Sequence, residues 1–402
     1  MSPVSSSSHS SPPSFNCGGD DDEKLLSVFY NQEYDCFSAG TSGGFRIYNC
    51  DPFGEKFRRD VKGSGGFKVV EMLFRSNIFA LVGSASNSQY SPNKVLIWDD
   101  HESRCIGEFS FRSEICGVKL RRDRIVIVLE HKIYVYNFMD LKLLHTIETL
   151  TNPKGLCCLS LHANTSVLAC PGLKRGHVRV EHFGLDVVKM IKAHESHIAF
   201  LTLTMDGLLL STASSRGTLI RIFNTLDGGC LQEVRRGGEK AEIYGIAFSR
   251  DVQWLAVSSN KGTVHVFSLR VRVANQDSLS DHNNYLLNRC SSSSIDPLTP
   301  TKAAINPQTS LLFMKGVLPK YFSSERSFAQ FHLQEETPFF VSFGVHNNVA
   351  IVGLDGRCFY FYFFIFLFFI LFGVQLLQVQ FRCGKWRGDE TSRVCTLYER
   401  LW

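Results

Sequence analysis

The most regular feature of the chain is a short segment of alternating apolar and polar residues that recurs six times. The copies are FRIYN (45–49), VLIWD (95–99), KIYVYN (132–137), VRVEH (178–182), LIRIFN (219–224) and VHVFS (264–268). Alternation with a period of two is typical of a half-buried β-strand. The last residues of successive copies lie 50, 38, 45, 42 and 44 positions apart, which is the spacing of four-stranded propeller blades. The pattern therefore predicts an all-β protein with six visible blades.

A seventh blade is predicted to begin at residues 339–356 (FFVSFGVHNNVAIVGLDG), which supply two strands and a turn. An uncharged run with eight phenylalanines, Cys358–Val374, then replaces the alternation. We therefore expect a seven-bladed, WD-repeat-like β-propeller over residues 25–357, with an incomplete seventh blade. The aromatic residues of its strands are expected in the core. They are Trp98, Tyr136, Phe223, Trp254 and Phe267.

Three segments lie outside the repeat. Residues 1–24 combine Ser, Pro, Gly and acidic residues with almost no apolar ones, which predicts a disordered tail, and they lack the pattern of a secretory signal. Residues 271–327 begin with a polar stretch and are expected to form a long loop inserted in blade 6. Residues 358–402 hold the phenylalanine-rich run and a tail without strand alternation.

The phenylalanine-rich run has two interpretations. As a helix it would cover roughly 25 Å at about 1.5 Å per residue, a marginal length for crossing a membrane, so one interpretation is a tail anchor. The other is the translated product of a retained intron, because Phe, Leu, Ile, Val, Tyr and Cys all have thymine-rich codons.

Composition and charge narrow the class of function. Apolar residues make up 44% and charged residues 20% of the chain, as in soluble globular proteins. The net charge of +5 is too small for nucleic-acid binding through bulk electrostatics, so any anion site must be local. None of the 13 cysteines forms a CxxC pair, so neither a zinc ribbon nor a disulfide framework is indicated, and the cysteines predict a reduced, cytosolic protein.

The segment LQEVRRGGEK (231–240) carries the clearest candidate chemistry. Arg235 and Arg236 follow an alternating strand, and successive side chains of a strand point to opposite faces. The two arginines would then serve separate pockets, one in blade 5 and one toward blade 6. A guanidinium is a planar fork of donors suited to phosphate. The alternative is a solvated arginine pair beside Glu233 and Glu239.

A duplicated turn accompanies the arginine pair. Ser214–Thr218 (SSRGT) recurs 45 positions later as Ser259–Thr263 (SNKGT). In such a turn, glycine lets backbone N–H groups approach a ligand, and the Ser and Thr hydroxyls can donate hydrogen bonds to that ligand. The segment is equally compatible with an ordinary hairpin turn. No nucleophile–histidine–carboxylate arrangement or metal-ligand spacing occurs, so we expect no enzyme activity, metal or cofactor.

These residues resemble those of the PROPPINs, seven-bladed propellers of autophagy that bind polyphosphoinositides. The likeness extends over residues 26–356, including GTSGGFRIYNCDPF, KLRRDRIVIVLEHKIYVYNF and FMKGVLPKYFSSERSFAQF, and the family's Phe/Leu-Arg-Arg-Gly motif appears as Val234–Gly237. The resemblance implies two head-group sites. The first would comprise His194, Thr212, Ser214, Gly217, Thr218, Arg221 and Arg235; the second would comprise Arg236, Gly237, Ser259, Thr263 and His265. Binding is expected to strengthen below about pH 6.5, where an ordinary histidine becomes charged.

The end of the inserted segment, residues 311–322, mixes apolar residues with two lysines, which suits either a membrane interface or packing on the propeller. The corresponding family loop inserts into membranes, which favours insertion of Phe313, Leu318 and Phe322. The resemblance further implies an effector of phosphatidylinositol 3-phosphate and phosphatidylinositol 3,5-bisphosphate that recruits autophagy machinery. It would be cytosolic and peripheral on preautophagosomal, endosomal or vacuolar membranes, with a large lipid-transfer protein as a partner and no nucleic acid. A protein-only WD-like scaffold is the rival interpretation.

Overall fold

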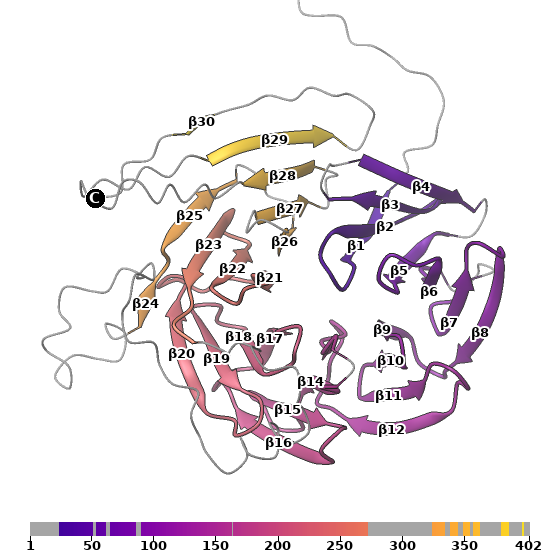
Figure 1. The fold of residues 1–402 in the computed structure, drawn as a ribbon, viewed down its shortest axis with the longest axis horizontal. Helices are drawn as coiled ribbons and strands as arrows, with labels where there is room; N and C mark the ends of the chain where they lie inside the picture. The colour runs from indigo at the N-terminus through magenta and orange to yellow at the C-terminus, as the bar shows by residue number, and fades with distance from the viewer. Residues whose placement is uncertain are drawn as a thin grey trace, which may run out of the picture.

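The computed structural model describes residues 24–50, 54–61, 65–85, 90–162, 164–271, 324–333, 338–344 and 349–353, and the backbone of three later strands. These residues contain strands and no helix, and their sheets are arranged around a central axis (Figure 1). The predicted all-β propeller is confirmed. Six sheets, numbered here as blades 1 to 6 in chain order, are each built on four strands.

The first four blades are antiparallel meanders in chain order. Blade 1 comprises β1 (Leu25–Tyr30), β2 (Cys36–Thr41), β3 (Gly44–Asn49) and β4 (Gly54–Asp60). Blade 2 comprises β5 (Phe67–Met72), β6 (Ile78–Gly83), β7 (Lys94–Asp99) and β8 (Arg104–Ser110). Blade 3 comprises β9 (Ile115–Arg121), β10 (Arg124–Leu129), β11 (Lys132–Asn137) and β12 (Leu143–Glu148). Blade 4 comprises β13 (Cys158–Leu159), β14 (Val167–Pro171), β15 (His177–His182) and β16 (Val187–Lys192).

Blades 5 and 6 are interrupted by the insert. Blade 5 comprises β17 (Ile198–Leu203), β18 (Leu209–Ser214), β19 (Leu219–Asn224), β20 (Cys230–Arg235) and, as a fifth strand, β24 (Glu325–Arg326). Blade 6 comprises β21 (Ile243–Phe248), β22 (Trp254–Ser259), β23 (Thr263–Ser268) and β25 (Ala329–His332). The sequence predicts a loop up to residue 327, whereas β24 pairs in parallel with β20. The returning chain therefore passes from the edge of blade 5 into blade 6.

The last sheet comprises β26 (Phe339–Phe343), β27 (Val349–Gly353), β28 (Arg357–Phe361), β29 (Val379–Lys385) and β30 (Thr396–Leu397). The sequence predicts no strand pattern beyond residue 357, yet β28 pairs with both β27 and β29. A ladder of this kind is formed by backbone groups, which do not require alternating side chains. Most of the phenylalanine-rich run, residues 362–374, lies outside the described residues. Within the described part of the chain, no helix is apolar and long enough to cross a bilayer.

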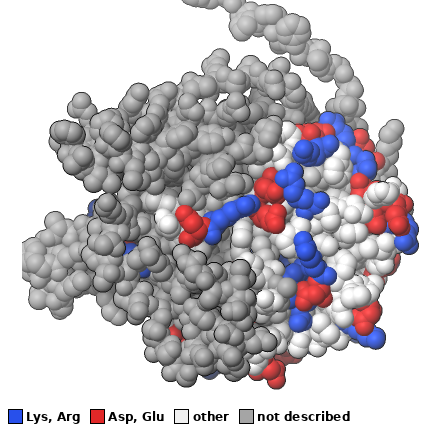
Figure 2. Space-filling view, in the orientation of Figure 1, with Lys and Arg blue, Asp and Glu red and all other residues white. Residues whose placement is uncertain are grey.

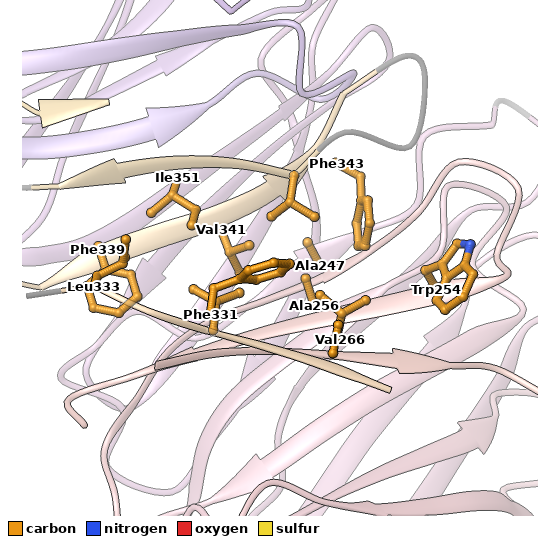
Figure 3. Close-up of a cluster of buried hydrophobic side chains, with 13 residues drawn as sticks. Ala247, Trp254, Ala256, Val266, Phe331, Leu333, Phe339, Val341, Phe343 and Ile351 are labelled. Carbon is orange, nitrogen blue, oxygen red and sulfur yellow. The ribbon is translucent and has the colours of Figure 1, made fainter. Parts of the chain in front are cut away.

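The core lies between neighbouring sheets. Figure 3 shows Phe331, Val266 and Trp254 of blade 6 packed in one cluster with Val341 and Ile351 of the last sheet. A second cluster joins the last sheet to blade 1, and it contains Ala350, Val352, Phe37 and Tyr48 among others. The predicted core positions agree with this packing, because Phe223, Trp254 and Phe267 are buried and Trp98 and Tyr136 pack against core clusters.

Candidate functional site: the edge between blades 5 and 6

The duplicated turn lies between the second and third strands of blades 5 and 6, and both copies place glycine in the left-handed region. Gly217 has φ +62° and Gly262 has φ +65°. An added Cβ at Gly217 would lie 1.9 Å from the carbonyl oxygen of Ala241, so the turn requires glycine. The hydroxyl-bearing residues are packed inward: Ser214, Ser259 and Thr263 are all buried, and Thr218 is half-buried.

Three residues of the predicted first site come together at the boundary between blades 4 and 5. The Nε2 of His194 lies 3.0 Å from the Oγ1 of Thr212. Arg221 in β19 donates from Nε to Glu233 (2.8 Å) and from Nη1 to the carbonyl of Ala193 (2.5 Å). The charge of Arg221 is therefore already balanced by a carboxylate.

Arg235 contacts the returning end of the insert. Its Nε donates to the Oγ of Ser324, at 2.8 Å and 89 positions away in the chain. Glu325 also accepts a hydrogen bond from Gln232 in β20 and pairs with Arg270. The end of the insert is thereby attached to blade 5 beside the arginine pair.

Arg236, directly after β20, is buried against the blade 5 turn. Its side chain is 8% exposed, and it donates from Nε to the carbonyl of Gly217 (2.6 Å) and from Nη2 to the carbonyl of Glu239 (2.5 Å). Among the described residues, no carboxylate lies within ion-pair distance of its guanidinium; Glu239 pairs with Lys261 at 3.0 Å, and its charge acts on Arg236 from farther away. Burial lowers the pKa of Arg236. The alternative interpretation, a solvated arginine pair, is therefore wrong for Arg236, which is buried.

The two predicted sites share one turn. Arg236, assigned to the second site, binds the Gly217 carbonyl and donates its backbone N–H to Thr218, which were both assigned to the first. Its charge also acts on His265 in blade 6. The Oγ of Ser259 lies 3.3 Å from the Oγ1 of Thr263. A Cβ added at Gly237 would have no neighbour within 4 Å. The two predicted sites are therefore neighbours that share the Gly217 turn.

Both candidate histidines are held neutral. Burial first, and the neighbouring Arg221 second, lower the pKa of His194 to about 4. Burial, with Arg236 and His332, lowers the pKa of His265 to about 4 as well. The expectation that each would become charged near pH 6.5 is therefore wrong for the unliganded protein, because an exposed reference histidine does not represent a buried one beside arginine.

Sequence reasoning missed the residues that the insert supplies. Ser324 binds Arg235, and the Oγ of Ser327 lies 3.2 Å from Nδ1 of His265. Neither serine follows the turn motif, so no local pattern identifies them. The predicted insertion residues Phe313, Leu318 and Phe322 lie outside the described residues. In the described part of the chain, no group of three or more His, Cys, Asp or Glu side chains is placed to hold a metal ion.

The surface charges fit a local rather than a general anion site. Figure 2 shows Lys and Arg interspersed with Asp and Glu on the described part of one face, without a field of single sign. The fold defines the class of this protein, a β-propeller, and the edge adds a buried arginine, Arg236, that forms no ion pair among the described residues.

Comparisons with known proteins place the chain within that class. The profile of the PROPPIN family matches residues 25–289. Autophagy-related protein 18e of Arabidopsis thaliana is 48% identical over 342 residues, which cover 84% of each chain. Autophagy-related protein 18 of Dictyostelium discoideum is 37% identical over 265 residues, covering 65% of this chain and 70% of that protein. The chain belongs to the PROPPIN family.

Solved structures agree on the fold. Kluyveromyces lactis Hsv2 superposes with a TM-score of 0.63 at 22% identity, covering 85% of this chain and 94% of that one. A complex of KlAtg21 with the coiled coil of AgAtg16 gives a TM-score of 0.64 at 24% identity, with coverages of 84% and 94%. At these identities the likeness shows the propeller fold.

Proposed function

We propose that the edge between blades 5 and 6 binds the head groups of phosphatidylinositol 3-phosphate and phosphatidylinositol 3,5-bisphosphate. The observation that carries the proposal is Arg236. In the described part of the chain this buried guanidinium donates to carbonyls and forms no ion pair, and the charge of Glu239 offsets the cost of its burial only in part. A phosphate monoester supplies the missing negative charge and accepts further charge-assisted hydrogen bonds.

Arg235 and the first predicted site provide the second contact in this proposal. Arg235 bonds to the neutral Ser324, and Arg221 is paired with Glu233. A head group at the boundary of blades 4 and 5 would therefore compete with an existing ion pair, so we expect weaker binding there than at Arg236. Two weak contacts on one membrane combine because each holds the other near its ligand.

We further infer a closed, seven-bladed ring in which the last sheet is the seventh blade. Clusters of buried residues join this sheet to blade 6 on one side and to blade 1 on the other. In this proposal the protein is a non-enzymatic effector that assembles on preautophagosomal, endosomal or vacuolar membranes and recruits autophagy machinery. A large lipid-transfer protein is a candidate partner by family resemblance.

The test compares single arginine variants. Arg236→Met should weaken flotation with vesicles that contain phosphatidylinositol 3-phosphate by roughly tenfold to a hundredfold, because a hydrogen bond to a charged group contributes about 1.5–3 kcal/mol. Arg235→Met should weaken it less, and the double change to Thr should abolish it. Arg112→Met is the control, because Arg112 is an exposed arginine in the connection between blades 2 and 3 and its loss changes the net charge equally.

Soluble inositol 1,3-bisphosphate separates head-group recognition from membrane contact, because it should raise the melting temperature of the wild type and not that of Arg236→Met. Unchanged flotation of the double variant would refute the head-group site and leave the protein-only scaffold as the better interpretation.

A further inference from the structure

A third glycine turn with basic residues connects β14 and β15 in blade 4. Gly176 has φ +72°, in the same left-handed region as Gly217 and Gly262. The sequence there, Leu173–His177 (LKRGH), lacks the serine and threonine of the other two copies, so the Ser-x-basic-Gly-Thr pattern does not detect it. The residues that precede the three glycines are Arg175, Arg216 and Lys261. Three consecutive blades thus present a cation at the equivalent connection.

This turn is bonded directly to the first candidate site. The carbonyl of Gly176 accepts hydrogen bonds from the backbone N–H groups of Ala193 and His194, both at 2.9 Å. Arg221 donates to the carbonyl of the same Ala193. The blade 4 turn therefore borders the candidate head-group edge, although none of its residues belongs to either predicted site.

Exposed apolar side chains accompany the basic residues. Leu173 is 56% exposed, and Lys174 and Arg175 are exposed with no carboxylate partner among the described residues. Met190 is 46% exposed, and its methyl group lies against Gly172 beside the turn. On β16, Val188 shares the face of Met190 and is 47% exposed. We call the surface formed by Leu173, Lys174, Arg175, Val188 and Met190 the blade 4 edge.

We propose that the blade 4 edge is a third membrane contact, which binds an anionic bilayer surface without recognising a particular head group. This inference rests on the proposed function, because the blade 4 edge adjoins the first candidate site and lies at the membrane when that site binds a lipid head group. Leu173 and Met190 enter the interface, and Lys174 and Arg175 lie among anionic head groups. Unpaired cations beside exposed apolar side chains are the combination that interfacial membrane segments use.

Charge complementarity selects the bilayer as the occupant. An exposed cation near an anionic leaflet strengthens binding by about fivefold, because the attraction per Lys or Arg is about 1 kcal/mol. Lys174 and Arg175, which form no ion pair with the described residues, retain that attraction in full, whereas ion-paired cations such as Lys192, held by Glu195 at 3.1 Å, lose part of it.

The experiment measures co-sedimentation with phosphatidylcholine vesicles that contain phosphatidylserine, with and without phosphatidylinositol 3-phosphate. Lys174→Ala combined with Arg175→Ala should weaken binding to both vesicle types by roughly 10- to 30-fold. Leu173→Ser should also weaken both. Neither variant should change the binding of soluble inositol 1,3-bisphosphate. The control, Lys56→Ala with Arg112→Ala, removes one exposed lysine and one exposed arginine that form no ion pair among the described residues, and it should bind like the wild type.

The outcomes separate this inference from the proposed function. If the double alanine variant binds both vesicle types as well as its control, the membrane role of the blade 4 edge is refuted and a protein partner becomes its better occupant. If the wild type binds phosphatidylserine vesicles through this edge but ignores phosphatidylinositol 3-phosphate, the head-group proposal fails and the blade 4 edge stands. Loss of soluble head-group binding in the variant would also refute a separate membrane contact.

Discussion

Acidification should destabilise the protein through His194 and His265, the two buried histidines of the candidate edge. Their pKa values of about 4 in the folded protein lie below the ordinary 6.5. The unfolded chain therefore binds protons first as the pH falls, so the stabilisation from neutral histidine is present above pH 6.5 and is lost progressively down to about pH 4. Between about pH 7 and about pH 5, each histidine should reduce the free energy of unfolding by about 2 kcal/mol.

The assay compares unfolding free energies at these two pH values for the wild type, His194→Gln, His265→Gln and the double variant. Glutamine can replace the hydrogen bonds to Thr212 and Ser327 but does not titrate. The acid-induced loss should shrink by about 2 kcal/mol in each single variant and by about 4 kcal/mol in the double variant. His101→Gln, at an exposed position, is the matched control. Equal acid-induced losses in the wild type and the double variant would refute the reasoning.

Four further predictions concern binding and the fold. The pKa of each histidine is about 4 in the unliganded protein, and a bound phosphate would have to raise it above about 5.5 to charge the ring in this range. We expect a smaller rise, so binding to vesicles with phosphatidylinositol 3-phosphate should not strengthen from about pH 7.5 to about pH 5.5 and should weaken slightly as the phosphate is protonated; strengthening that disappears in the histidine variants would contradict this. Gly217→Ala should lower stability by more than about 2 kcal/mol in thermal unfolding, since it adds left-handed strain to a contact with the Ala241 carbonyl, whereas Gly237→Ala, with open space, should be tolerated. Replacing the apolar residues of the insert by serine should reduce vesicle binding and spare soluble head-group binding, and an equal loss in both would assign them to propeller packing. These residues are Phe313, Leu318 and Phe322. Transcript sequencing should reveal a shorter spliced form that lacks the phenylalanine-rich run; if every mature message encodes the run, carbonate extraction of the membrane fraction then tests the tail anchor.

Local pattern was sufficient for the propeller fold and its first six blades, but not for β24 or for the strands from β28 onward. The alternation in segments such as LIRIFN reflects one buried and one less buried face of a strand, which is a property of neighbouring residues, and its period near 43 residues marks the blades. The turns at Gly217 and Gly262 could also be predicted from the sequence, because a left-handed turn restricts the residue type at one position. The third turn, at Gly176, fits the same pattern of a basic residue before glycine when the pattern does not also require serine and threonine.

Only the tertiary structure decided the chemistry of the edge. Adjacent arginines in a sequence carry no sign of which one is buried, whereas in the structure Arg236 is buried and donates to the carbonyls of Gly217 and Glu239. Ser324 reaches Arg235 across 89 positions, and Ser327 reaches His265 across 62. The depressed histidine pKa values have the same origin, because desolvation depends on all atoms that surround the ring. Strand formation depends on the residues next along the chain, whereas burial and charge balance depend on residues that only folding brings together.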